Sequence, residues 1–388
     1  MRIAIMIDSL AIGGAQKHVR QLACGLAGEG HVVTVLVLNN IVEALYLEPL
    51  KAVGVEVRVI GKSGVLSGFG LLTSSWFLWR GGFDAVITVL FVSTLFGRFA
   101  AQLAGGIPIL TCLQARNINY RWWQKLLVRA TGPLTAHTVS NSRSALLWAA
   151  ENEGVEMRHS SYIPNAVDPP KAAGQLPSWT ELGLPQLEGK RVIGSLGRLD
   201  RQKGYDILID ALSRIPPGER SDLSVVVFGE GTDRCCLETL RDRCGLEDVL
   251  FLPGVHTNVE YILPKLWLYV QPSRFEGTPN AVMEALAAGL PVHASAVDGL
   301  IELPKSQNLR FVEQTPEAWA SALQDIASKK LTRDHVVTCF LSPGQTSERY
   351  LDTLWKVLKS VEKWASGSDP RELYELAHAK SKSRPYSH

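Results

Sequence analysis

Short apolar runs alternate along the first half of the chain with segments in which apolar residues recur every three or four positions. An apolar run is typical of a parallel strand covered on both faces, and the wider spacing is typical of an amphipathic helix. After Gly13-Gly14, for example, Val19, Leu22 and Leu26 would share one face of a helix. The pattern therefore predicts a βαβ series with strands at residues 2–7, 32–38, 55–60, 85–90, 107–112, 138–140 and 161–163.

The same alternation begins again after a proline-rich stretch that contains Pro164, Pro169, Pro170, Pro177 and Pro185. We interpret residues 169–190 as a linker between two doubly wound α/β domains, residues 1–168 and 191–345. Such domains would face each other across a central cleft, and their ligands would bind at the carboxyl ends of the strands. The remaining predicted elements are strands at 192–197, 224–228, 249–252, 268–271 and 291–295, helices at 205–215, 234–244 and 346–366, and a polar tail at 367–388.

The most informative segment of the second half is a turn-rich loop that runs into a helix, with a glutamate near each end. Gly277 and Pro279 favour a loop, and Asn280 is a good N-cap for the helix that follows. The free N–H groups of a helix N-terminus suit a phosphate, and the Glu276 and Glu284 carboxylates could accept hydrogen bonds from hydroxyls. This combination indicates a nucleotide-sugar site. By themselves, the two glutamates could equally be a loop carboxylate and part of a solvated helix face.

Two further loops follow predicted strands and could meet an anion. In the loop at 197–204, Arg198 offers a guanidinium fork and Lys203 a point charge, which are the usual partners of a diphosphate. At the first strand, Gly13-Gly14 lets backbone N–H groups approach an anion closely. The alternatives are a solvated basic turn for the first loop and an ordinary tight βα turn for the second.

Residues 116–129 combine tryptophans with Arg116, Arg121, Lys125 and Arg129, and they contain no acidic residue. Basic residues beside interfacial aromatic residues favour contact with an anionic membrane surface. The alternative is an exposed amphipathic helix with its tryptophans in the core. No apolar stretch approaches the roughly 20 residues that a spanning helix needs.

The overall charge of +2 is small, which argues against nucleic acid as the main partner. The six cysteines have no metal-type spacing, which fits a reduced, cytoplasmic protein, peripheral at most on the inner face of the membrane. The sequence lacks an Asp-x-Asp pair and a phosphate loop ending in Gly-Lys-Ser/Thr. We therefore expect no metal and no cofactor, and we expect Arg198, Lys203 and the helix N-terminus to neutralise a leaving diphosphate.

Taken together, the segments GGAQKHVRQLACGLAGEGHVVTVL, SNSRSAL, YIPNAVD, GRLDRQKGYDILIDAL, FGEGTDR and PSRFEGTPNAVMEALAAGLPVHAS resemble the retaining glycosyltransferase family 4. The resemblance implies a GT-B fold of two Rossmann-like domains, with a C-terminal helix that crosses back to the first. It also implies that Arg198 and Lys203 hold the donor diphosphate, that Glu276 binds donor-sugar hydroxyls and that Glu284 binds ribose hydroxyls. The backbone at Gly277, Thr278, Pro279 and Asn280 would meet sugar and phosphate, and Gly14 would approach the diphosphate from the first domain.

One departure from the family concerns the acceptor side. Many members carry a histidine after the fourth or fifth strand, close to the reacting sugar, whereas residues 111–117 contain none. Arg116 and Asn117 are the candidates for that region. The family's mechanism is described as front-face, in which the leaving phosphate oxygen helps to deprotonate the acceptor, so no protein nucleophile is required.

The resemblance therefore implies a retaining, metal-independent enzyme that moves a sugar from a UDP- or GDP-sugar to a glycan or a lipid-linked acceptor. Cell-surface polysaccharide or glycolipid synthesis would be its setting. Two alternatives stay open, which are a GT-B sugar-nucleotide epimerase and a catalytically silent nucleotide-sugar-binding subunit.

Overall fold

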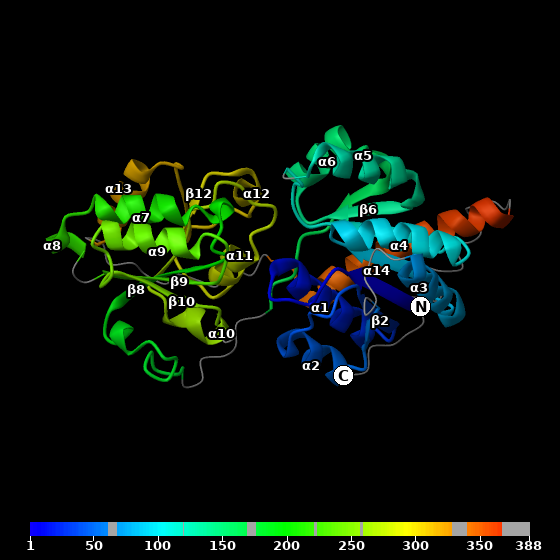
Figure 1. The fold of residues 1–388 in the computed structure, drawn as a ribbon, viewed down its shortest axis with the longest axis horizontal. Coiled ribbons are helices and arrows are strands. Elements are labelled where there is room, and N and C mark those ends of the chain that lie inside the picture. Colours follow the sequence, from blue (N-terminus) through cyan, green and yellow to red (C-terminus); the bar gives the residue numbers. More distant parts are fainter. Residues whose placement is uncertain are drawn as a thin grey trace.

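The computed structural model describes residues 1–60, 68–118, 120–168, 176–220, 223–256, 259–327 and 340–366, and it contains two parallel sheets, each flanked by helices (Figure 1). The first sheet has seven strands in the order β3-β2-β1-β4-β5-β6-β7. The strands are β1 (Arg2–Ile7), β2 (Val32–Val37), β3 (Glu56–Val59), β4 (Ala85–Val89), β5 (Ile109–Leu113), β6 (His137–Ser140) and β7 (Ser160–Tyr162). The central strands are apolar because helices cover both of their faces.

Right-handed crossovers place the helices of this domain in two layers. One layer contains α1 and α2, and the other runs from α3 through α4 and α5 to α6, each helix packed against the next. The helices are α1 (Gly14–Gly28), α2 (Ala44–Ala52), α3 (Gly68–Gly81), α4 (Phe91–Leu103), α5 (Trp122–Thr131) and α6 (Arg143–Glu153).

The second sheet has six parallel strands in the order β10-β9-β8-β11-β12-β13. Its strands are β8 (Arg191–Leu196), β9 (Leu223–Phe228), β10 (Leu250–Gly254), β11 (Leu268–Gln271), β12 (Val292–Ser295) and β13 (Leu309–Val312). The helices are α7 (Tyr205–Ser213), α8 (Pro217–Arg220), α9 (Arg234–Arg243), α10 (Val259–Ile262), α11 (Asn280–Ala287), α12 (Asp298–Ile301) and α13 (Pro316–Ala327). The predicted strands of both domains are confirmed to within two residues at each end, and β13 was not predicted.

The predicted linker is longer than the structure supports. Trp179, Leu182 and Leu187 are buried in a core of the second domain, together with residues of β8 and β12. Residues 176–190 are therefore part of that domain, because their apolar side chains complete its core. Residues 169–175 lie outside the described part of the chain, as does the predicted tail at 367–388.

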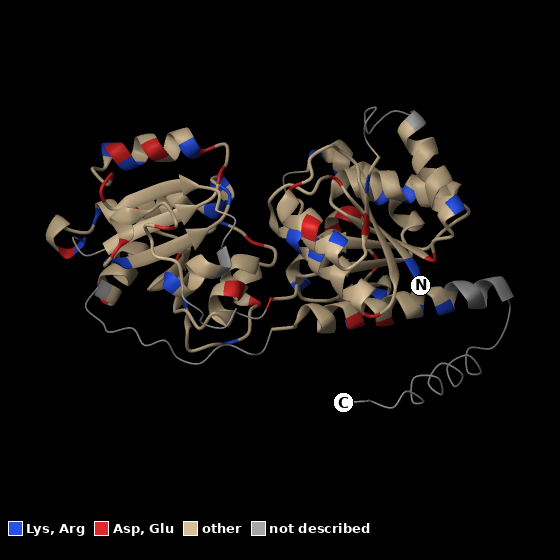
Figure 2. Cartoon of the chain, turned by 90° about the horizontal axis from the view of Figure 1, so that it is seen from below, with Lys and Arg blue, Asp and Glu red and all other residues tan. Residues whose placement is uncertain are grey.

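A C-terminal helix, α14 (Pro343–Ser366), lies along the first domain (Figures 1 and 2). It begins three residues before the predicted helix and packs against α1. Tyr350 and Leu354 belong to the core of the first domain, and the Tyr350 hydroxyl is 3.1 Å from Nε2 of His18. The predicted crossing-back of this helix is therefore confirmed. Within the described residues, no helix combines the length and apolarity that a membrane-crossing segment requires.

The strand order of each sheet marks a position where a ligand can bind. In the first sheet the order reverses between β1 and β4, and in the second between β8 and β11. Loops that leave such neighbouring strands in opposite directions open a crevice at the carboxyl ends of the strands. The loops after β1, β8 and β11 carry the Gly13-Gly14 pair, the basic residues and Glu276, respectively.

Candidate active site

Glu276 lies in the loop between β11 and α11, and only 5% of its side chain is exposed. Its Oε1 accepts hydrogen bonds from Ser273 Oγ at 2.6 Å and from Gln271 Nε2 at 3.2 Å. Lys203 Nζ is 2.7 Å from the same oxygen. A buried carboxylate needs such partners, because leaving its charge unpaired would be very costly. The Glu276 side chain is therefore held in one position.

The basic loop after β8 presents its two cations differently. Lys203 ends a short 3₁₀ turn (Arg201–Lys203), and Gly204 follows it with a φ of +67°. This conformation favours glycine. Arg198 is 68% exposed, and its Nη2 is 3.2 Å from both Asp200 Oδ2 and Gln202 Oε1. Lys203 is thus bound to Glu276, whereas the exposed guanidinium of Arg198 can reach an anion.

The predicted role of Asn280 as an N-cap is wrong. Pro279 occupies the cap position, Asn280 is the first helical residue, and no side chain caps α11. Instead, the Asn280 side chain contacts the first domain, since Oδ1 accepts from Asn165 Nδ2 at 2.8 Å and Nδ2 donates to the Gly14 carbonyl at 3.4 Å. The structure therefore brings Gly14 and the N-terminus of α11 together, as a shared anion site requires. At its other end α11 stops at the C-cap Ala288, and Gly289 follows with a φ of +72°, a conformation that favours glycine.

Glu284, on α11, forms an ion pair with a residue of the first domain. Its Oε1 is 2.9 Å from Nζ of Lys17, which also lies 3.6 Å from Asp168 Oδ2. Although burial opposes the charge of Lys17, the two carboxylates outweigh it and raise the pKa of the ammonium. The sequence analysis did not identify Lys17, although it lies one turn after the Gly13-Gly14 pair.

The loop of Glu276 touches the first domain directly. A Cβ added to Gly277 would lie 2.6 Å from the carbonyl oxygen of Gln114, so only glycine fits there. Beside this contact Arg116 forms an ion pair with Asp298, and Thr278 Oγ1 donates to the Asn141 carbonyl. A cavity of about 250 Å³ lies here, lined by Ala115, Arg116, Ile118, Arg274, Phe275, Glu276, Gly277, Ala296, Val297 and Asp298. We call it the reaction cavity.

The side chains of Arg116 and Asn117, the two acceptor-side candidates, lie in different parts of the structure. Arg116 lines the reaction cavity, whereas the Asn117 side chain donates to Glu153 Oε1 at 2.8 Å inside the first domain. The resemblance had offered both as acceptor-side candidates, and the structure places only Arg116 at the reaction cavity.

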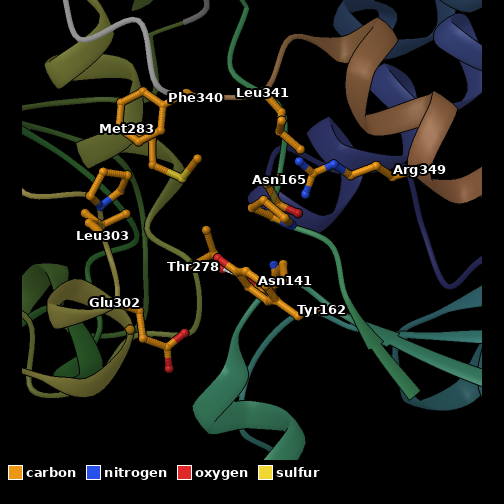
Figure 3. A pocket seen from close by; sticks show the side chains of 13 residues that line it. Asn141, Tyr162, Asn165, Thr278, Met283, Glu302, Leu303, Phe340, Leu341 and Arg349 are labelled. Carbon is orange, nitrogen blue, oxygen red and sulfur yellow. Dashed lines mark hydrogen bonds between the residues drawn. The ribbon is translucent and has the colours of Figure 1, made fainter. Parts of the chain in front are cut away.

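A further cavity of about 170 Å³ lies between the domains, lined by residues that include Tyr162, Met283, Glu302 and Arg349 (Figure 3). The Glu302 carboxylate accepts hydrogen bonds from the backbone N–H groups of Arg143 at 2.9 Å and Ser144 at 2.7 Å. A residue of the second domain thus occupies the N-terminus of α6 in the first, where a negative charge is favourable. Sequence reasoning did not identify this contact, because Glu302 lies far along the chain from α6.

Of the predicted site residues, the structure brings Gly14 and the Gly277–Asn280 backbone to the domain boundary and fixes Glu276 against Lys203. In the described ranges, no group of three or more His, Cys, Asp and Glu side chains is arranged to hold a metal ion. Around this boundary lie the predicted cations Arg198 and Lys203, the predicted carboxylates Glu276 and Glu284, and a glycine-bearing loop. Such a set suits an anionic ligand that also carries hydroxyl groups.

Both halves of the chain match glycosyltransferase family models. Residues 12–171 match the model described as Glycosyltransferase Family 4, and residues 183–338 match the model described as Glycosyl transferases group 1. The two matches follow each other without overlap, one in each domain. The resemblance to glycosyltransferases therefore extends over most of the chain.

Several characterised proteins are related in sequence. The 2-deoxystreptamine glucosyltransferase of Streptomyces kanamyceticus is 32% identical over 202 residues, which are 50% of this chain and 48% of that protein. Lipopolysaccharide core biosynthesis mannosyltransferase LpsB of Rhizobium meliloti is 29% identical over 190 residues, 47% and 50% of the two chains. The matched region thus spans about half the length of these relatives. A third relative, from Campylobacter jejuni, is 24% identical over 306 residues, which are 75% of this chain and 80% of that protein. Its name is N-acetylgalactosamine-N,N'-diacetylbacillosaminyl-diphospho-undecaprenol 4-alpha-N-acetylgalactosaminyltransferase.

Solved structures share the fold over nearly the whole chain. Anabaena HepE, in complex with UDP and glucose, has a TM-score of 0.73 at 17% identity and covers 95% of this chain and 100% of its own. A glycosyltransferase from Rickettsia africae has a TM-score of 0.71 at 16% identity, covering 92% and 98%. At such low identity the likeness establishes the fold, which is the GT-B arrangement.

Proposed function

We propose that this chain, which the comparisons place among the glycosyltransferases of GT-B fold, transfers a sugar from a nucleoside diphosphate sugar to a hydroxyl of a glycan or lipid-linked acceptor. The observation that carries the proposal is the buried pair of Lys203 and Glu276, 2.7 Å apart at the carboxyl ends of β8 and β11 and beside the reaction cavity. The pair brings a diphosphate-binding cation next to a hydroxyl-binding carboxylate.

The donor would lie across the domain boundary. Arg198 and Lys203 would bind the diphosphate, since a guanidinium and an ammonium both suit phosphate oxygens. Glu276 would accept hydrogen bonds from sugar hydroxyls. Glu284, held by Lys17, would accept them from the ribose. The backbone at Gly277–Asn280 and at Gly14 lies close enough together to contact sugar and phosphate from both sides.

The residues support a front-face reaction with retention. The bond between the anomeric carbon and the diphosphate oxygen breaks, and its electron pair stays on that oxygen. The same oxygen takes the proton of the acceptor hydroxyl, whose oxygen bonds to the anomeric carbon on the face that the diphosphate leaves. Arg198 and Lys203 stabilise the developing negative charge without a metal ion. Glu276 already bonds Lys203 and Ser273, which favours a binding role over that of a nucleophile.

We propose a uridine or guanosine diphosphate sugar as the donor. HepE, with which this chain shares its fold, binds UDP. Named relatives act on 2-deoxystreptamine and on lipopolysaccharide core, and one acts on an undecaprenol-linked substrate. These acceptors share hydroxylated rings, and the last is lipid-linked, which supports polysaccharide or glycolipid synthesis as the setting.

We also propose that the first domain contacts an anionic membrane surface from the cytoplasmic side. Trp122 on α5 is 77% exposed and Trp79 on α3 is 66% exposed, so these tryptophans are not in the core. Helices α3, α4 and α5 pack one against the next and contain no acidic residue. Exposed aromatic residues on an acid-free helical layer suit the boundary between headgroups and acyl chains.

A donor screen followed by product analysis tests the proposed function. Purified protein is heated with UDP, GDP and their sugars, because a ligand of the native state raises its apparent stability. The donor that binds is then incubated with acceptors in EDTA, and the anomeric configuration of the product is read by NMR. Transfer with retention supports the proposal. An epimerised donor without acceptor would identify an epimerase, and donor binding without turnover would identify a silent subunit.

A further inference from the structure

A smaller cavity inside the first domain adjoins the reaction cavity. Its volume is about 100 Å³, and it lies at the carboxyl ends of β4 and β5, between α4 and α5. Ala115, in the loop after β5, lines both cavities. A water molecule occupies about 30 Å³ of the liquid, so this cavity has room for a larger group. We call it the inner cavity.

Part of the inner cavity is apolar. Leu90, Phe91, Val128 and Val155 line it, and Phe91 meets the ring of Tyr120 edge-on with 4.9 Å between the ring centroids. Leu90, at the end of β4, has a φ of +80° although it is not glycine. Such a conformation is strained, and strained residues gather at functional sites. The apolar wall could receive the C–H face of a sugar ring.

The polar part of the inner cavity contains a buried carboxylate that lacks a full set of partners. Glu153 is 1% exposed, and its Oε1 accepts from Asn117 Nδ2 at 2.8 Å. Its Oε2 has no hydrogen-bond partner among the described residues. Burial raises the pKa of this carboxyl, which the Asn117 hydrogen bond and the charge of Arg98 partly offset. Leaving a buried acceptor unpaired is costly, which suggests that a ligand provides the missing donor.

The hydrogen bonds that the nearby Arg98 donates go to groups other than this oxygen. Arg98 is itself buried, and its Nε donates to Thr135 Oγ1 at 2.8 Å. Its Nη1 donates to Thr131 Oγ1 at 2.8 Å and to the Val128 carbonyl at 3.0 Å. Arg98 therefore links α4 to the C-terminal part of α5 and places a positive charge at the cavity. Oε2 of Glu153 can still accept a hydrogen bond.

We propose that the inner cavity binds one edge of the acceptor sugar, with a ring hydroxyl donating a hydrogen bond to Glu153 Oε2. This inference rests on the proposed function and specifies its acceptor subsite. The acceptor ring packs against Phe91 and Leu90, and its reacting hydroxyl passes Ala115 into the reaction cavity. Asn117 is a positioning residue, because it contacts Glu153 and fixes which oxygen faces the ligand.

The test is a set of steady-state rates with octyl glycosides of glucose, mannose and N-acetylglucosamine, and with their singly deoxygenated analogues. In the wild type, loss of one particular hydroxyl raises the acceptor KM about tenfold, as the loss of one hydrogen bond to a charged group does. In Glu153→Gln, the acceptor KM is already about tenfold higher and no longer responds to that deoxygenation. The two changes are thus non-additive, which a merely structural role of Glu153 would not produce.

Two further variants keep the test decisive. Glu151→Gln changes an exposed glutamate on the same helix and leaves every KM unchanged. Val128→Phe fills the cavity from α5 and raises the acceptor KM while the donor KM stays the same, which provides a second reading if Glu153→Gln fails to fold. If both the wild type and Glu153→Gln transfer sugar, and removing that hydroxyl raises the acceptor KM equally in both, this inference alone is overturned. A wild-type protein that neither binds a nucleotide sugar nor transfers one would overturn it together with the proposed function.

Discussion

Lys17 of the first domain and Glu284 of the second form an ion pair across the domain boundary, with 2.9 Å between Nζ and Oε1. Both side chains are largely buried, so removing either partner would leave the other charge buried without its counter-ion. The pair joins the first turn of α1 to the proposed ribose site on α11. The contact between the domains and the proposed ribose binding therefore involve the same carboxylate.

The first prediction concerns this pair. Lys17→Met and Glu284→Gln should each weaken UDP or GDP binding roughly tenfold, since each removes a charged partner worth about 1.5 kcal/mol. The double variant should lose clearly less than the product of the two effects, because both changes break one interaction. Isothermal titration of the nucleotide measures this, with Arg214→Met, on the surface of the second domain, as the control. Fully multiplicative losses would mean that the two residues act separately.

A second prediction separates folding from turnover at the buried pair. Glu276→Gln should reduce turnover at least a hundredfold, and its melting temperature should fall less than that of Lys203→Met, because the amide keeps a hydrogen-bond acceptor for Lys203 and Ser273. Lys203→Met should also destabilise the second domain, by about 3 kcal/mol or more, since it leaves the Glu276 charge buried without its cation. Melting curves and turnover are measured together, with the exposed Glu313→Gln as the control. An active Glu276→Gln would contradict the assignment.

The sequence predicted the sheets well because a parallel strand buried on both faces is an apolar run whatever its neighbours are. It also named Glu276 and Lys203, which lie in glycine-bearing loops directly after such strands, and the structure brings their side chains into contact. It did not identify Lys17, Glu302 or Glu153, whose roles come from contacts across the domain boundary or inside a cavity. Asn280 shows the difference most directly, because a residue that is locally a good N-cap uses its side chain on Asn165 and Gly14 instead.

A third prediction concerns Gly277. In Gly277→Ala the new methyl group would meet the Gln114 carbonyl, so the two domains could not approach as they do here. Turnover should fall at least tenfold, and nucleotide binding should weaken as well, because Gly14 and the Lys17–Glu284 pair depend on the same approach of the two domains. Small-angle scattering should show a larger radius of gyration. Gly218→Ala is the matched control, because a Cβ there meets no other atom. Unchanged activity in Gly277→Ala would mean that the contact with Gln114 is not needed for the reaction.

The fourth prediction concerns the acid-free layer of α3, α4 and α5. Wild-type protein should sediment with vesicles of phosphatidylglycerol and phosphatidylcholine at low salt, and it should be released at high salt because the attraction to anionic lipid is screened. Replacing Trp122 and Leu126 by serine should reduce binding several-fold. Trp355→Ser, on α14, removes an exposed tryptophan that lies outside this layer and should bind as the wild type does. Equal binding of all three proteins, or none at low salt, would refute the proposed contact.

The last prediction concerns the pH dependence of the first domain. Burial lowers the pKa of His18 to about 4, whereas in the unfolded chain it is close to 6.5. Between these values the unfolded chain binds more protons than the folded one, so stability is complete above pH 6.5 and falls as the pH approaches 4. The loss amounts to roughly 3 kcal/mol. It should appear in α1 and α14, because Nε2 of His18 lies against the Tyr350 hydroxyl.

Hydrogen exchange of the amides of α1 and α14 between pH 4.5 and 7.5, corrected for the intrinsic rates, measures this loss of protection. In His18→Gln the pH dependence of that protection should largely disappear, although its level at pH 7.5 should also be lower, since the imidazole packing is lost. His159→Gln, at an exposed histidine, should keep the wild-type dependence. If His18→Gln and the wild type lose protection in parallel as the pH falls, another group controls the docking of α14.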